Sequence, residues 1–91
     1  MVEFSIKVEN EVGLHARPAS LFVQTSNEFE ANIEVRNATS GSDWVDAKSI
    51  LSVLTLAVEQ DHEVEIRTDG ADDEAAADAL KELINSNFGE S

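Results

Sequence analysis

The sequence predicts an α+β domain, an open-faced β-sandwich in which three helices cover one face of a four-stranded, largely antiparallel sheet. Four short segments alternate apolar and polar residues, which is the period of strands with one buried and one solvated face. Two other segments place apolar residues three and four positions apart, which is the spacing of helices with one buried face, and a third, short helical segment is apolar almost all round. In chain order these segments predict the arrangement β-α-β-β-α-β-α.

The first third of the chain predicts one strand and one helix. Apolar and polar residues alternate over residues 2–8, which indicates a half-buried strand. A helix is expected from about residue 15 to residue 28. The residues of its apolar face are Ala19, Phe22, Val23 and Phe29. Leu21 falls outside this face, and we therefore expect it to be exposed.

The middle of the chain predicts a hairpin. Ile33 and Val35 mark the second strand, and the turn-forming residues 37–42 follow it. A short third strand is expected at Trp44 and Val45. Neighbouring residues of a strand face opposite sides of a sheet. With Val45 directed to the core, Trp44 is expected on the open face, where it covers strand backbone or marks an oligomer contact.

The second half predicts a helix, a strand and a final helix. Ser49 is a suitable N-cap for a helix over about residues 50–58, a segment that is apolar almost all round. A short helix buries only one side well, so part of this segment covers the edge of the core or forms an exposed contact patch. Alternation over residues 63–67 predicts the fourth strand. Apolar spacing predicts the last helix over about residues 72–87, with Gly89 as its terminator.

Length and composition indicate a single domain over residues 1–91. The chain has 19 acidic residues against 6 Lys and Arg, and its net charge of −13 argues against nucleic-acid binding. It has no cysteine, which excludes disulfides and thiolate metal sites. No signal peptide is recognisable, and the longest nearly apolar run is less than half a membrane span. We therefore expect a cytoplasmic protein without membrane insertion.

Acidic residues are missing from two stretches of this acidic chain. Residues 12–27 and residues 47–58 contain no Asp or Glu, and they carry Arg17 and Lys48. We interpret these stretches as parts of a surface that handles an anion.

The stretch Gly13-Leu14-His15-Ala16-Arg17-Pro18-Ala19 places a histidine where a helix begins. Proline is favoured in the first turn of a helix, so His15 is expected at about the N-cap. The free N–H groups and the positive dipole end of a helix N-terminus attract anions. An imidazole there, with the Arg17 guanidinium nearby, could accept a phosphoryl group on a ring nitrogen. The alternative is that His15 serves as an ordinary helix cap.

This stretch, together with Lys48-Ser49-Ile50 and the turn Asp69-Gly70-Ala71, resembles the HPr family over essentially the whole chain. HPr proteins are the histidine phosphocarriers of the phosphoenolpyruvate-dependent sugar phosphotransferase system. The resemblance implies a sheet order of 1-4-2-3 and a transient phosphohistidine, with the phosphoryl group on Nδ1 of His15. It implies phospho-Enzyme I as donor, a sugar-specific enzyme IIA as acceptor, and a carrier rather than an enzyme. No cofactor or metal is expected, and a monomer is the simplest state for such a shuttle.

The resemblance also assigns roles to residues around His15. Arg17 would balance the phosphoryl charge, and Ser49 matches a serine that a regulatory HPr kinase phosphorylates in some bacterial members. The plain alternative for Ser49 is a helix cap. The residues assigned to partner binding are Ala16, Ser20, Leu21, Ile50, Leu51 and Leu54. Members often carry lysines around this docking surface, whereas the residues of this chain there are Gln24, Asn27 and Ser52.

Other interpretations remain open from the sequence. An HPr-like carrier could serve a nitrogen-regulatory or dihydroxyacetone branch, or could regulate through Ser49 alone. The element order also resembles a ferredoxin-like domain that binds a small molecule, but this leaves residues 15–18 without explanation. His62 is expected to be a surface residue, and two distant histidines without cysteine do not form a metal site. The acid-rich residues 69–78 lack the spacing of a calcium loop.

Overall fold

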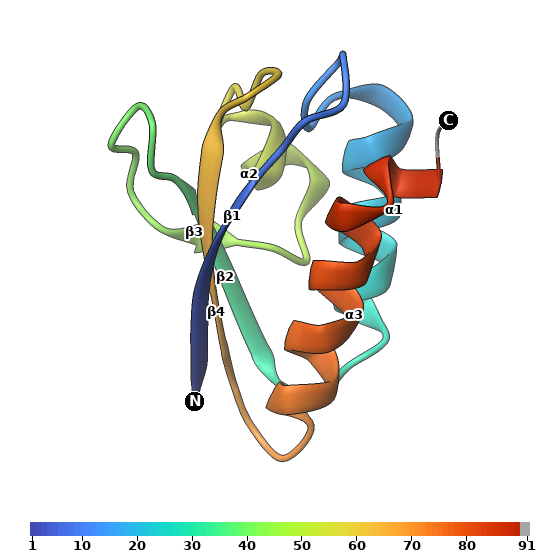
Figure 1. Ribbon diagram of the computed structural model, residues 1–91. Helices are drawn as coiled ribbons and strands as arrows, with labels where there is room; N and C mark the ends of the chain where they lie inside the picture. Colours follow the sequence, from blue (N-terminus) through green and yellow to red (C-terminus); the bar gives the residue numbers. More distant parts are fainter. Residues whose placement is uncertain (90–91) are drawn as a thin grey trace.

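The computed structural model describes residues 1–89 and contains the predicted strands and helices in the predicted order (Figure 1). The elements are β1 (Val2–Lys7), α1 (Ala16–Asn27), β2 (Asn32–Asn37), β3 (Val45–Asp46), α2 (Ile50–Leu54), β4 (Glu63–Asp69), α3 (Asp73–Asn85) and the short 3-10 helix η1 (Asn87–Gly89). None of the helices within residues 1–89 has the length and apolar character needed to cross a membrane.

The four strands form one antiparallel sheet in the order β1-β4-β2-β3. The central strand β4 pairs with β1 from Val2 opposite Thr68 to Lys7 opposite Glu63. Figure 1 shows α1 and α3 on one side of the sheet and no helix on the other side. The α+β class, the open-faced arrangement and the sheet order are therefore confirmed.

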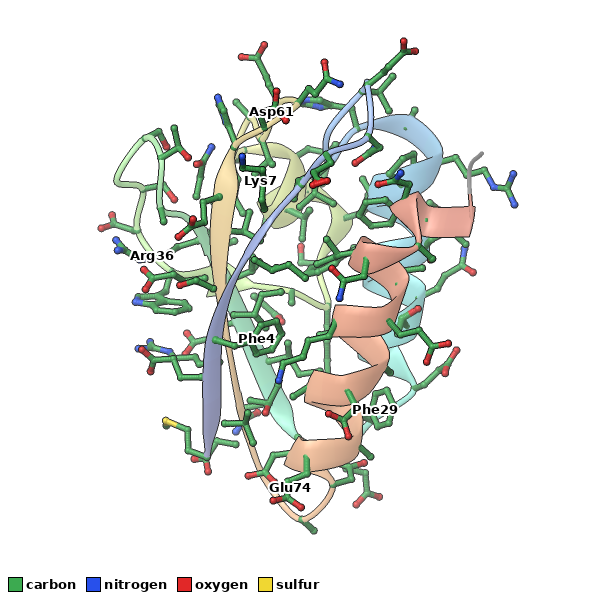
Figure 2. All side chains as sticks on the ribbon, viewed as in Figure 1. Phe4, Lys7, Phe29, Arg36, Asp61 and Glu74 are labelled. Carbon is green, nitrogen blue, oxygen red and sulfur yellow. The ribbon has the colours of Figure 1, made fainter. Side chains whose placement is uncertain are left out.

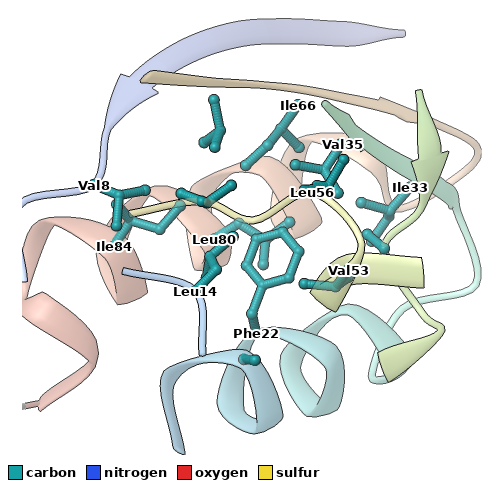
Figure 3. Close-up of a cluster of buried hydrophobic side chains, with 14 of the residues drawn as sticks. Val8, Leu14, Phe22, Ile33, Val35, Val53, Leu56, Ile66, Leu80 and Ile84 are labelled. Atoms are coloured by element: carbon teal, nitrogen blue, oxygen red, sulfur yellow. The ribbon is translucent and has the colours of Figure 1, made fainter. Parts of the chain in front are cut away.

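One core joins the sheet to the helices (Figure 3). Its largest fully buried side chains are Phe22, Phe88, Leu14, Ile33, Ile66, Leu80, Ile84, Val8, Val35, Val53, Val58 and Val64. Burial of each such aliphatic or aromatic side chain contributes about 1.5–3 kcal/mol. The core thus receives residues from both helical and strand segments, as the alternating patterns predict.

The predicted apolar face of α1 is correct, but the expectation for Leu21 is wrong. Ala19 and Phe22 are fully buried, and Val23 and Phe29 are half-buried against the core. Leu21 is also half-buried and packs on the same cluster. Since α1 contacts both α2 and α3, more of its circumference is covered than a helix lying on a sheet alone would have.

Helix α2 ends at Leu54, four residues before the predicted end. In a straight helix, Val58 would point about 140° away from Val53. The chain instead leaves the helix and takes a positive φ of 49° at Ala57. Leu56 and Val58 are both buried as a result. The apolar composition of residues 50–58 therefore reflects burial of a turn as well as of a helix.

The third strand and the last helix also differ from their predicted bounds. Strand β3 pairs Val45 with Val35 and Asp46 with Glu34, so Trp44 precedes the strand and does not belong to it. Helix α3 ends at Asn85. Asn87 and Phe88 take positive φ values of 55° and 58°, which folds Phe88 back into the core before Gly89 is reached. The prediction that Gly89 terminates the helix is therefore wrong.

Trp44 lies on the open face of the sheet, as expected. The Arg67 guanidinium is 4.1 Å from the centroid of the Trp44 ring, and that of Arg36 is 5.7 Å away. Each arginine also forms an ion pair across the strands, Arg67 with Glu34 and Arg36 with Glu65. Figure 2 shows Arg36 on the side of the sheet away from the helices. The indole thus covers part of the face that no helix protects.

Candidate phosphoryl-acceptor site

His15 occupies the N-cap of α1. Its backbone is extended, with φ −131° and ψ 161°, and the helix begins at Ala16 with Arg17 and Pro18 in its first turn. The imidazole is half-buried and makes no capping hydrogen bond to the helix. His15 thus holds the position of a helix cap without the bond that defines side-chain capping. The His15 ring therefore does not act as a side-chain cap of α1, which is the role that the alternative interpretation gives it.

The backbone just before His15 passes close to the segment that follows α2. Gly13 has a φ of +65°, and a Cβ atom there would lie 2.1 Å from the Val58 carbonyl oxygen. The N–H of Leu14 donates to the same carbonyl at 3.0 Å, and the Leu14 side chain is fully buried. Only glycine fits the close approach at position 13. The path of the chain into His15 is therefore fixed by tertiary contacts.

Ala16, directly after His15, has a φ of +53°. A residue with a side chain pays about 1–3 kcal/mol for such a conformation, and it persists only where the surroundings impose it. Strain of this kind is concentrated at functional sites. The strained Ala16 thus lies next to His15, which the sequence singles out as the candidate acceptor.

The surroundings of His15 favour an anion. Arg17 is exposed and forms no ion pair with any residue of the range 1–89. Neither α1 nor α2 has an acidic residue in its first turn. The free N–H groups at the start of α1 and the Arg17 guanidinium can therefore act on an anion, and no carboxylate lies in the first turn of either helix.

Ser49 is the N-cap of α2, as predicted, and its Oγ accepts the N–H of Ser52 at 3.4 Å. The Lys48 ammonium group, unlike the Arg17 guanidinium, is engaged in a hydrogen bond within residues 1–89. Its Nζ donates to the Phe29 carbonyl at 2.7 Å, and its own carbonyl accepts from the Asn27 side chain at 3.1 Å. These bonds join the start of α2 to the end of α1.

A group of apolar side chains on α2 is exposed to solvent. The exposed fraction is 74% for Leu51, 40% for Ile50 and 37% for Leu54, whereas Val53 of the same helix is fully buried. On the neighbouring helix α1, Ala16 and Ser20 are exposed and Leu21 is half-buried. We call the six residues assigned to partner binding, on these two helices, the α1–α2 surface.

Sequence reasoning considers His62 but not Val12, an apolar residue that is 46% exposed in the turn before Gly13. His62 is half-buried rather than a simple surface residue. Its Nδ1 accepts the N–H of Glu59 at 3.2 Å and lies 3.1 Å from Asn37 Nδ2, so it secures the turn before β4. Within residues 1–89, no cluster of three or more His, Cys, Asp or Glu residues could hold a metal ion.

Comparison with known proteins agrees with this geometry. A family model described as "PTS HPr component phosphorylation site" matches residues 2–86. The chain belongs to the HPr family. A phosphocarrier protein HPr of Neisseria meningitidis serogroup A is 40% identical over 90 residues, which cover 99% of this chain and 98% of that protein.

Two further proteins are similar to this chain over most of its length. The crystal structure of HPr from Thermoanaerobacter tengcongensis superposes with a TM-score of 0.94 at 44% identity and covers 100% of this chain and 99% of that one. A multiphosphoryl transfer protein of Vibrio cholerae is 38% identical over 86 residues, which are 94% of this chain but 22% of that protein. Membership of the HPr family makes the chain a phosphocarrier rather than an enzyme.

Proposed function

We propose that His15 carries the phosphoryl group, which it accepts from phospho-Enzyme I and passes to a sugar-specific enzyme IIA. The observation that carries this proposal is an imidazole at a helix N-cap that makes no capping hydrogen bond and has an exposed arginine two residues away, which forms no ion pair within residues 1–89. In the transfer, a ring nitrogen of neutral His15 forms a bond to phosphorus while the donor's bond to phosphorus breaks. We propose Nδ1 as this nitrogen, since HPr proteins carry the group there.

The environment of His15 suits a carrier that must also release the group. A helix N-terminus contributes about 0.3–1 kcal/mol to an adjacent anion when exposed. Since about 1.4 kcal/mol changes an equilibrium tenfold, this biases the transfer without trapping the phosphoryl group. Arg17 balances part of the added charge from an exposed position. Stronger electrostatic stabilisation would slow the second transfer.

We infer that the α1–α2 surface docks both partners. Its exposed leucines and isoleucine lie on the helix next to the one that begins after His15. A single surface that serves donor and acceptor in turn is most simply presented by a monomer. We further propose that residues 1–91 act as one domain in the cytoplasm.

Regulation through Ser49 is a second proposal. Its hydroxyl lies at the N-terminus of α2, where a phosphate would meet free N–H groups and replace the present bond to Ser52. An HPr kinase would then add negative charge to the α1–α2 surface. Ser49→Asp should slow phosphoryl acceptance at His15, with Ser49→Ala as the uncharged control. Equal rates for the two variants would contradict a regulatory role.

The phosphoryl-transfer proposal is tested with Enzyme I, magnesium and radiolabelled phosphoenolpyruvate. We expect an acid-labile, alkali-stable phosphate on the wild-type protein, none on His15→Ala, and full labelling of His62→Ala. The label should pass to an added enzyme IIA. Absence of label on the wild type, or full label on His15→Ala, would refute the proposal.

A further inference from the structure

The turn that precedes His15 is closed by the side chain of Asn10. Its Nδ2 donates a hydrogen bond of 2.9 Å to the Gly13 carbonyl. The N–H of Gly13 in turn donates to the Asn10 carbonyl at 3.2 Å. Two hydrogen bonds between the same two residues restrict the turn of residues 10–13. The chain passes from this turn through Leu14 directly to His15.

Asn10 holds this position with an unfavourable feature. The side chain is only 6% exposed, and its Oδ1 has no hydrogen-bond partner among residues 1–89. A buried acceptor without a partner destabilises a protein and calls for an explanation. Reversal of the amide would bring Oδ1 against the Gly13 carbonyl, so the observed orientation is the one that serves Gly13. Asn10 thus keeps the hydrogen bond from its Nδ2 to Gly13, although its Oδ1 has no partner among residues 1–89.

Backbone hydrogen bonds hold the chain before and after the turn of residues 10–13. The side chain of Asn10 connects these two fixed segments. Before the turn, Val8 exchanges backbone hydrogen bonds with the segment 61–62, at 2.7 and 2.9 Å. After it, the Leu14 N–H is held by the Val58 carbonyl. The bond from Asn10 to the Gly13 carbonyl fixes the peptide between Gly13 and Leu14. That peptide determines how the backbone enters His15 and the strained Ala16.

We propose that Asn10 is a positioning residue for the phosphoryl acceptor: its carboxamide fixes the Gly13–Leu14 peptide and thereby the place of the His15 ring at the start of α1. This inference rests on the proposed role of His15. Asn10 acts through the backbone and not by contact with the phosphoryl group. Transfer rates are sensitive to such positioning, because a displacement of about 1 Å can cost about 100-fold.

The kinetic test uses two variants and a matched control. Asn10→Ala removes the carboxamide, and Asn10→Asp keeps its shape but replaces the donor by an oxygen. Ser26→Ala is the control, since the fully buried Ser26 hydroxyl also donates to a backbone carbonyl, that of Phe22 at 2.9 Å, but within α1. We expect both Asn10 variants to accept the phosphoryl group about tenfold more slowly at saturating phospho-Enzyme I, with little change in KM. Ser26→Ala should stay near the wild-type rate.

Rates are compared per folded molecule, from the folded fraction measured by circular dichroism. A second readout does not depend on transfer: nitrogen-15 NMR of the His15 ring and of the amides of residues 14–16. We expect these resonances to move in Asn10→Asp and to stay in place in Ser26→Ala. If Asn10→Ala does not fold, Asn10→Asp, which also lacks the donor, provides both readouts.

The outcomes separate this inference from the proposed function. Labelled wild type with equally fast Asn10 variants would overturn the positioning role and leave the function intact. An equal loss in Ser26→Ala, or unmoved His15 resonances in folded Asn10 variants, would also overturn it. Absence of label on the wild type would remove the proposed function and this inference with it.

Discussion

Single residues hold the loop between α1 and β2. The two carboxylate oxygens of Asp72 accept the N–H groups of Glu30 and Ala31 at 2.9 and 2.8 Å. The hydrogen bond from Glu30, more than any other influence, lowers the pKa of Asp72 below its usual value. Lys48 also holds this loop, through the Phe29 carbonyl. One acid far along the chain thus holds the loop that follows the helix beginning after His15.

Asp72→Asn should lower the free energy of unfolding at neutral pH, because the carboxamide has a single, uncharged acceptor oxygen and its NH2 group would face one of the two N–H groups. The pKa of Asp72 is lower in the folded protein than in the unfolded chain. Its stabilisation is therefore complete above the ordinary aspartate pKa of about 3.9, declines as pH falls below that value, and is lost below the folded pKa. Urea unfolding of both proteins from pH 7 to pH 2 measures this. A difference that persists undiminished at the lowest pH would contradict the assignment.

At the level of elements, α2 divides its apolar residues between two tasks. Val53 is fully buried, whereas Leu51 is 74% exposed although both are large and apolar. Core packing accounts for the first residue but not for the second. The proposed docking of partners gives the exposed residues a role.

Replacement of these two residues should have opposite consequences. Leu51→Ala is expected to change the free energy of unfolding by less than about 0.5 kcal/mol, as for other surface substitutions. It should raise the KM for Enzyme I about tenfold, which corresponds to about 1.4 kcal/mol of docking energy. Val53→Ala should cost roughly 2 kcal/mol of stability through the cavity it leaves. Urea unfolding and steady-state phosphorylation measure the two effects, and an unchanged KM for Leu51→Ala would speak against docking through α2.

The open face of the sheet depends on Trp44 and its arginines. Trp44→Ala should lower the free energy of unfolding by about 1–2 kcal/mol, because the stack on Arg67 and the cover of the strands are both lost. Trp44→Phe keeps a ring and should lose less. Phosphorylation of His15 should be unaffected in both variants, since no helix lies on this face. Urea unfolding followed by circular dichroism provides the measurement, and equal stability of all three proteins would exclude the proposed cover.

The molecule as a whole carries a large negative charge. Its 19 acidic residues face only 6 Lys and Arg, and Arg36, Arg67 and Lys48 are already engaged in local contacts. Repulsion among the remaining carboxylates disfavours the compact state, and salt screens it.

The Tm should therefore rise with salt, by about 5 °C or more between 10 mM and 1 M NaCl, since 1 kcal/mol corresponds to about 4–8 °C in a domain of this size. The matched variant neutralises three exposed acids of α3 in the combination Glu74→Gln, Asp78→Asn and Glu82→Gln. It should show a higher Tm at low salt and a smaller rise. Calorimetry measures both, and a Tm that does not respond to salt would contradict dominant charge repulsion.

The local features of the fold were predictable from the sequence. Strand alternation and helical spacing depend on neighbouring residues, so the element order and the covered face could be predicted. The N-cap positions of His15 and Ser49 were predictable for the same reason. The stretch around His15 and the other short stretches that resemble HPr are likewise visible in the sequence alone.

Other features depend on contacts between distant parts of the chain, and these only the folded structure could decide. Helix α2 stops at Leu54 because Leu56 and Val58 must both reach the core, and the Val58 carbonyl then fixes Gly13 and Leu14. The hydrogen bond from the Asn10 side chain to the Gly13 carbonyl is not predicted by any periodic pattern in the sequence. Local interactions therefore specify where His15 lies in the sequence of elements, and packing between distant segments specifies how its ring is presented.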